Sequence, residues 1–135
     1  MVASVRPFLM FQGDAEAAIN FYVSVFPCAE IIDIVRYKAG EAGPEGSVMN
    51  ATFSIAGQVV MCIDSPVKHE FGFTPAVSLF VECETENEIG SLAESLAEGG
   101  AIFMPLDDYG FSRKFAWVND RFGVSWQLNL RHESS

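Results

Sequence analysis

Basic residues are scarce in this sequence. It has 8 lysines and arginines against 18 aspartates and glutamates, a formal net charge of −10. Such a surface repels phosphate backbones and no basic cluster offsets it, so nucleic-acid binding is not expected. The same charge keeps a chain in solution and favours a cationic small molecule over an anion.

Long apolar runs are also missing, although 50% of the residues are hydrophobic. No run approaches the roughly 20 residues that cross a bilayer as a helix, so no membrane span is expected. The first residues lack the charged start and apolar stretch of a secretory signal, which favours a cytoplasmic location. With 135 residues, the chain is expected to form a single domain over 1–135.

Cysteine and histidine, the commonest metal ligands, are rare. The cysteines Cys28, Cys62 and Cys83 have no CxxC spacing, and each lies in or beside an apolar run. Buried free thiols are therefore expected. His132 lies in the polar C-terminal tail, and His69 lies in a mid-chain connection. A solvated ring is more frequent there than a catalytic one.

Motifs of common enzyme classes are absent as well. The sequence has no G-x-S-x-G elbow, phosphate loop or dinucleotide fingerprint. A methyltransferase that uses S-adenosylmethionine would be expected to show a glycine-rich turn from a strand into a helix. Gly99-Gly100 ends a predicted helix instead of opening one, so no cofactor is expected.

What the sequence does contain is one pattern of elements that occurs twice. The first half, 5–64, is expected to form a strand over 5–11, a helix over 15–26 capped by Asp14, and strands over 30–37, 48–55 and 58–63. After a connection over 65–75, the second half, 76–130, is expected to form a strand over 76–81, a helix opened by a Thr85–Glu88 capping box, and strands over 101–104, 115–118 and 124–130. The halves therefore read as an internal repeat.

The final strand shows the clearest alternation. Apolar side chains are expected on one side (Val124, Trp126, Leu128, Leu130) and polar ones on the other (Ser125, Gln127, Asn129). This pattern suits a sheet with its core behind and a polar-lined hollow in front. An edge strand whose polar side meets water is the alternative.

The repeat resembles the vicinal-oxygen-chelate superfamily, which includes glyoxalase I, extradiol dioxygenases and bleomycin-resistance proteins. Three stretches resemble its PhnB-like branch, often labelled 3-demethylubiquinone-9 3-methyltransferase: Pro7 to Pro27, Tyr37 to Val48, and Phe115 to Gln127 with its DRFGVSWQ run. The resemblance implies an α+β fold of two βαβββ modules that form a curved mixed sheet with a cleft. It also implies a homodimer.

The resemblance further implies metal-ligand positions on the first and last strand of each half. Matching the repeats places these positions at Pro7, Met61, Ala76 and Gln127. Proline and alanine have no ligand atom, and a methionine thioether is too soft for the ions that this chemistry uses. No metal site is expected.

A small-molecule pocket remains as the candidate site. Its candidate residues are Leu9, Phe11, Met61, Ser78, Phe80, Arg113, Trp117, Ser125, Gln127 and Asn129. The loop over 105–114 is a candidate lid, with Gly110 as its hinge and Arg113 as an anion anchor. Plain core packing of the aromatic residues, and an ordinary surface loop, are the alternatives.

Two functions stay open at this point. One is a metal-independent protein that binds or sequesters a small molecule, as the bleomycin-resistance members do. The other is an enzyme with a rearranged non-metal site, either a lyase or isomerase, or a methyltransferase as the family label suggests.

Overall fold

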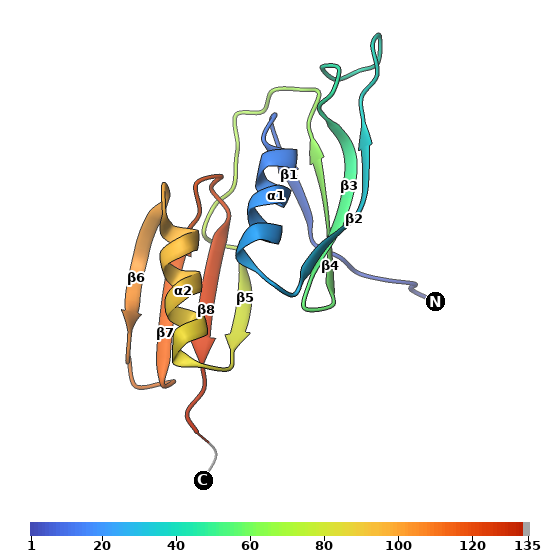
Figure 1. Ribbon diagram of the computed structural model, residues 1–135. Helices are drawn as coiled ribbons and strands as arrows, with labels where there is room; N and C mark the ends of the chain where they lie inside the picture. The colour runs from blue at the N-terminus through green and yellow to red at the C-terminus, as the bar shows by residue number, and fades with distance from the viewer. Residues whose placement is uncertain (134–135) are drawn as a thin grey trace. The chain divides into compact units, whose positions relative to one another are not determined.

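The chain forms two compact units, Met1–Gly72 and Phe73–Ser135, in a computed structural model that describes residues 1–133. Each unit has the predicted order of one strand, one helix and three strands (Figure 1). The expected α+β fold with two βαβββ modules is confirmed. The strands form two four-stranded sheets, where one long curved sheet was expected. Neither helix of the described residues is long and apolar enough to cross a membrane.

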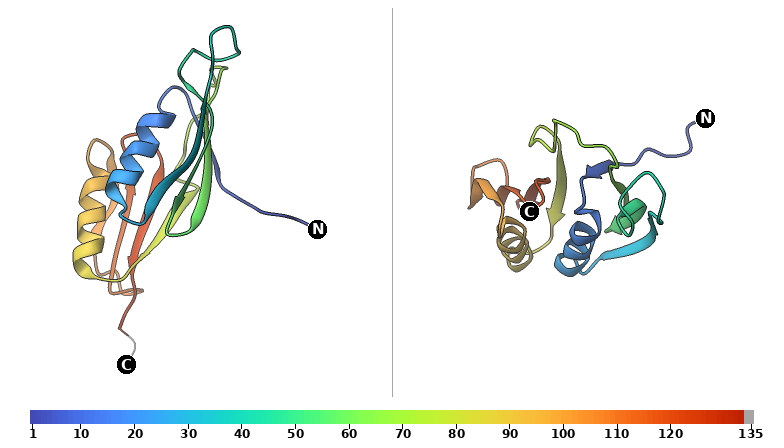
Figure 2. Two further views of the ribbon diagram at one scale, coloured as in Figure 1. Left: turned by 45° about the vertical axis from the view of Figure 1, so that its right-hand side comes forward. Right: turned by 90° about the horizontal axis from the view of Figure 1, so that it is seen from above.

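The first unit consists of β1 (Phe8–Phe11), α1 (Ala15–Val25), β2 (Ala29–Arg36), β3 (Val48–Ile55) and β4 (Gln58–Asp64). Its strands lie in the order β1-β4-β3-β2, with β1 parallel to β4 and the other neighbours antiparallel. The helix α1 packs against one face of this sheet (Figure 2). Tyr22 of α1 stacks on Phe53 of β3 with ring centroids 5.9 Å apart, and both side chains are fully buried.

The start of α1 is held by a residue from the far end of the unit. Asp14 is the N-cap residue of α1, as predicted, but its side chain makes no cap hydrogen bond. Asp64, the last residue of β4, accepts instead from the backbone N–H of Gly13 (2.8 Å) and Ala15 (2.9 Å) through Oδ1. Its Oδ2 accepts from Val48 N–H (2.9 Å) at the start of β3. One buried carboxylate thus satisfies three donors from separate segments.

The second unit consists of β5 (Ser78–Cys83), α2 (Glu86–Ala97), β6 (Ala101–Asp107), β7 (Lys114–Asn119) and β8 (Ser125–Leu130). Its strands lie in the order β5-β8-β7-β6, with β5 parallel to β8 and the other neighbours antiparallel. The helix α2 packs against one face of this sheet (Figure 2). β6 runs three residues further than the predicted 101–104 and includes Pro105, which an edge strand tolerates.

The residues predicted to begin and end α2 do so, but one hydrogen bond of the predicted capping box has a different partner. Thr85 Oγ1 accepts from Glu88 N–H (3.1 Å), as in a capping box, but the Glu88 carboxylate accepts from Glu84 N–H (2.9 Å) instead of from Thr85. At the other end Gly99 has a φ of 77°, which favours glycine. A Cβ on Gly100 would lie 2.0 Å from Asn119 O, so only glycine fits between the helix end and β7.

Candidate functional site

The sheet of the second unit has one apolar face and one mixed face. On the side that carries α2, Trp126 and Leu128 of β8 are 1% and 0% exposed. The residues that alternate with them along β8, Ser125, Gln127 and Asn129, point to the opposite side. We call that side the front face. The predicted alternation of β8 is confirmed, and it divides the core from the candidate site.

The strand register arranges the front face in three rows that cross β5, β8 and β7. In the middle row Gln127 lies between Phe80 of β5 and Trp117 of β7. The first row is Ser78, Ser125 and Asn119, and the third row is Glu82, Asn129 and Phe115. Seven of the ten candidate residues belong to the second unit, and six of these lie in the three rows: Ser78, Phe80, Trp117, Ser125, Gln127 and Asn129.

The polar side chains of the front face bond to one another. Trp117 Nε1 donates to Ser125 Oγ (2.9 Å), and Ser125 Oγ lies 2.7 Å from Ser78 Oγ. Gln127 Nε2 donates to Ser78 Oγ (3.2 Å). A fixed chain of side chains is therefore present before any ligand binds, and such preformed polar groups are what orient a ligand in a site.

Aromatic rings surround this polar chain. Phe103 of β6 lies against Trp117 with ring centroids 5.0 Å apart and planes tilted by 55°. Phe80 is 56% exposed, so the middle row ends on β5 in an aromatic ring that solvent reaches. Phe115 and Trp117 share the front face, and Phe115 makes an edge contact with Phe111 (5.0 Å) in the β6–β7 loop.

The sequence analysis missed two residues that contact the candidate residues of the front face, Phe103 and Glu82. Glu82 Oε2 accepts from Asn129 Nδ2 (3.0 Å) and lies 3.4 Å from Arg131 Nε. The signal for Glu82 was available, because it is two residues beyond Phe80 on the same strand and so shares its face. Phe103 offered no such signal, since a bulge interrupts the register of β6 beside it.

In the first unit, the expected orientation of Leu9 and Phe11 is wrong. The register pairs Leu9 with Cys62 and Phe11 with Asp64, and Cys62 and Asp64 are 0% and 3% exposed. Phe11 is itself buried, at 3% exposure, so both side chains belong to the helix side of this sheet. Met61 lies on the opposite side, level with Phe8.

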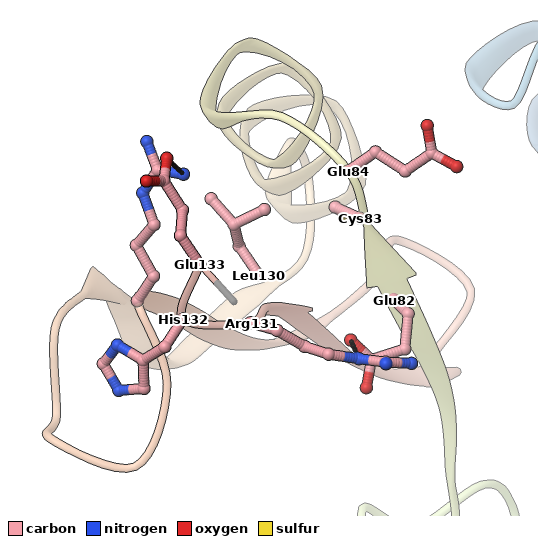
Figure 3. Close-up of a pocket in the computed structure, with 8 residues that line it drawn as sticks. Glu82, Cys83, Glu84, Leu130, Arg131, His132 and Glu133 are labelled. Carbon is pink, nitrogen blue, oxygen red and sulfur yellow. Dashed lines mark hydrogen bonds and ion pairs between the residues drawn. The ribbon is translucent and has the colours of Figure 1, made fainter. Parts of the chain in front are cut away.

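A charged hollow of about 510 Å³ opens at the end of β5 and β8 (Figure 3). It is lined by Glu82, Cys83, Glu84, Arg113, Leu130, Arg131, His132 and Glu133. Arg113 is the candidate residue that lines it, but its guanidinium pairs with Glu133 (3.0 Å) and Glu86 (3.6 Å). Two carboxylates beside Arg113 weaken its case as an anion anchor.

The candidate lid has its own internal contacts. Tyr109 donates its hydroxyl to Pro105 O (2.5 Å), and Gly110 N–H donates to Asp108 Oδ1 (2.8 Å). Gly110 has a φ of 97°, a conformation that favours glycine in a fixed turn as well as in a hinge. The lid therefore stays a prediction.

A second hollow, of about 390 Å³, lies in the first unit among loop residues that include Ser47, Ser65 and Lys68. Beside it, Ser65 Oγ is 3.0 Å from His69 Nε2. The same hydroxyl donates to Val67 O (2.8 Å) and accepts from Val67 N–H (3.2 Å), so it closes a local turn. This commits the serine proton to the turn.

The positions that would hold a metal do not carry suitable donors. Pro7 and Ala76 lie just before β1 and β5, and the residues level with Met61 and Gln127 on those strands are Phe8 and Phe80. Phenylalanine has no ligand atom, and one amide oxygen does not make a site for a dication. Within residues 1–133, no three His, Cys, Asp or Glu side chains lie together in a metal-binding group. The residues present do not fit a metal ion.

The two buried thiols are poor nucleophiles. Burial raises the pKa of Cys62 to about 12, and the Asp64 carboxylate adds to the shift. Burial likewise raises the pKa of Cys83 to about 12, with smaller effects of Glu88 and Glu82. The thiolate is the reactive form, so neither residue supplies a thiolate at neutral pH.

Comparison with known families supports the resemblance seen in the sequence. The family model described as 3-demethylubiquinone-9 3-methyltransferase matches residues 3–129. A solved PhnB protein of Bacillus cereus, which carries the same family name, is 55% identical with a TM-score of 0.92, and the match covers 95% of this chain and 99% of that one.

More distant solved structures share the fold alone. A glyoxylase/bleomycin resistance protein/dioxygenase domain from Frankia is 16% identical with a TM-score of 0.62, covering 100% of this chain and 96% of the other. The fosfomycin resistance protein FosX of Listeria monocytogenes, solved with Mn(II) and a dihydroxypropylphosphonic acid, is 17% identical with a TM-score of 0.66. That match covers 96% of this chain and 93% of FosX.

Proposed function

Because the chain belongs to the 3-demethylubiquinone-9 3-methyltransferase family and shares its fold with a glyoxylase/bleomycin resistance protein/dioxygenase domain, we propose that it binds or sequesters a small organic molecule without a metal ion. The middle row of the front face carries this proposal. There, Gln127 of β8 is level with Phe80 on β5 and with Trp117 on β7, and its amide donates to Ser78 Oγ. An apolar surface with a few fixed polar groups is how small-molecule sites are built.

The chemistry of the front face favours binding over catalysis. Among its described residues in the three rows, Glu82 is the ionisable one, and it is engaged by Asn129 and Arg131. General acid–base catalysis needs a group that exchanges protons near neutral pH. Amides, hydroxyls and aromatic rings bind and orient a ligand but do not exchange protons in that range. The net charge of −10 favours an uncharged or cationic ligand.

The alternative is an enzyme, and the family name makes methyl transfer its most specific form. Such an enzyme needs S-adenosylmethionine, which is a cation and would meet no repulsion from this acidic chain. A lyase or isomerase with a rearranged site is the other enzymatic form. A lyase or isomerase would place a proton-exchanging side chain against the ligand, but the ionisable residue of the three rows, Glu82, is engaged by Asn129 and Arg131.

A thermal-shift screen distinguishes these functions. A ligand that binds the folded state alone raises the melting temperature by mass action. We expect no shift with S-adenosylmethionine and a shift with one or more uncharged or cationic aromatic compounds. The Gln127→Leu variant should lose the shift, whereas Gln58→Leu, an exposed glutamine at the start of β4, should keep it. A shift with S-adenosylmethionine that depends on Gln127 would favour the methyltransferase.

Elemental analysis tests the metal-independent part. We expect well below one Zn, Ni, Mn or Fe per chain in purified untagged protein, because Phe8, Met61 and Phe80 supply no hard donor. About one equivalent of any of these metals would contradict the proposal.

A further inference from the structure

The hydrogen-bonded chain of the front face has a direction. An indole N–H only donates, so Ser125 Oγ must accept from Trp117 Nε1. Ser125 is 1% exposed, so its own proton cannot be given to solvent. Among residues 1–133, the second contact of this hydroxyl is Ser78 Oγ at 2.7 Å. The Ser125 proton therefore points to Ser78, because a buried donor without an acceptor is unfavourable.

This direction determines whether the Ser78 hydroxyl can donate its proton to a ligand. Its oxygen accepts from Ser125 and also from Gln127 Nε2 (3.2 Å). A serine hydroxyl has two acceptor lone pairs and a single proton. Both lone pairs are used by the chain of side chains, so the Ser78 proton remains for a partner outside that chain. Ser78 is half-buried on the front face, where a ligand can reach it.

The surroundings of Ser78 are aromatic on the same face. Phe80 follows two residues later on β5 and is 56% exposed. Trp117 lies beyond Gln127 in the same row as Phe80, and Phe103 lies against it. Flat apolar surface thus adjoins one fixed hydroxyl donor. Aromatic rings attract other rings in offset or edge geometry.

The geometry points to a ligand class that deepens the proposed function and rests on it. The site takes a flat aromatic compound that carries a carbonyl-type hydrogen-bond acceptor. The ring lies over Phe80 and Trp117, and the acceptor oxygen receives the Ser78 proton. Ser78 is therefore the residue that selects a carbonyl compound over a hydrocarbon of the same shape.

A matched pair of probes tests this. 2-Acetylnaphthalene carries the acceptor, and 2-ethylnaphthalene has the same ring and nearly the same size without it. In equilibrium dialysis we expect the wild-type protein to bind the acetyl compound about tenfold more tightly, as one good hydrogen bond to an otherwise unpaired donor allows. The Ser78→Ala variant should bind both compounds with the wild-type affinity for the ethyl compound. Ser91→Ala, an exposed serine on α2, is the control and should keep the tenfold preference.

Three results would overturn the inference: equal binding of both probes by the wild type, equal weakening of both by Ser78→Ala, or no binding of either. The unfolding midpoint of Ser78→Ala shows whether its effect is one of folding. If a compound in the thermal-shift screen binds in a Gln127-dependent way while the naphthalene pair fails, the proposed function stands and the ligand class is wrong. If no compound depends on Gln127, the proposed function itself fails.

Discussion

Trp126 donates its indole N–H to Asp120 Oδ2 (2.9 Å), and both residues are almost fully buried. The other oxygen of Asp120 accepts from the backbone N–H of Phe122 (2.8 Å) and Val124 (3.1 Å). The carboxylate therefore holds the β7–β8 turn and fixes the tryptophan behind the candidate site. Like Asp64 in the first unit, Asp120 accepts from three donors.

Removal of the Asp120 carboxylate should destabilise the protein strongly. Asp120→Ala leaves an indole and two turn amides without this acceptor, so we expect the free energy of unfolding to fall by about 3 kcal/mol. Asp33→Ala, at an exposed position on β2, is the control and should change it by less than about 0.5 kcal/mol. Urea denaturation measures both, and equal effects would contradict a structural role for Asp120.

The two faces of β8 should respond differently to substitution. Gln127→Leu removes one half-buried hydrogen bond, to Ser78, and should cost about 1 kcal/mol. Trp126→Ala leaves a cavity behind the sheet and should cost roughly 3–5 kcal/mol. Chemical denaturation of both variants decides the matter. If Gln127→Leu is as destabilising as Trp126→Ala, then Gln127 is a core residue and not a ligand contact.

The three cysteines should differ in reactivity. Cys28 is exposed, whereas Cys62 and Cys83 are buried with raised pKa values. We expect a disulfide reagent such as Ellman's to modify one thiol quickly in native protein and the other two only after denaturation. A Cys28→Ser variant should show no fast reaction. Fast modification of two or three thiols would contradict the burial of Cys62 and Cys83.

The same two thiols should weaken the fold at alkaline pH. Each has its pKa raised from 9.0 to about 12, so the folded chain keeps protons that the unfolded chain releases. This contribution is intact below pH 9 and is lost as the pH rises toward 12, by at most about 1.4 kcal/mol per pH unit for each thiol. The free energy of unfolding of a Cys62→Ala, Cys83→Ala double variant should fall less steeply over this range. Identical slopes would show that the thiols titrate normally in the folded chain.

Dimerisation also remains a prediction, and the edge strand β2 offers a surface for it. Ile31, Ile32 and Val35 on this strand are 38%, 53% and 43% exposed. Burial of such apolar side chains between two copies is favourable. Sedimentation equilibrium should give twice the 14.8 kDa chain mass at micromolar concentration. Ile32→Lys should shift it toward monomer, and Val77→Lys, on an exposed residue of the second unit, should not.

The sequence predicted best where side chains alternate. β8 changes character at every residue, so the assignment of its side chains to two faces followed from the pattern alone. β1 reads Phe-Leu-Met-Phe, with no polar residue to mark the solvent side. Any phase fits such a strand, and the chosen one placed Leu9 and Phe11 on the wrong face. The register with β4 settles that question, and it is not a local property.

Contacts between distant segments could not be predicted from the sequence for a related reason. Asp14 has the right residue type and position for a cap, but Asp64 supplies the acceptor from about 50 residues away. Nothing local distinguishes an acidic residue at a strand end that binds backbone amides from one that faces water. The same limit applies to Arg113, whose carboxylate partners come from α2 and the C-terminal segment.

The Asp64 carboxylate has a consequence for the motions of the first unit. Gly13, Ala15 and Val48 donate to the same two oxygens, although they belong to the turn before α1, to α1 itself and to β3. Displacement of this one side chain would release all three amides together. Their hydrogen exchange should therefore report a single opening event, with similar protection and a common response to denaturant. The start of the helix and the start of the strand would then open as one cooperative element, despite the more than 30 residues of chain between them.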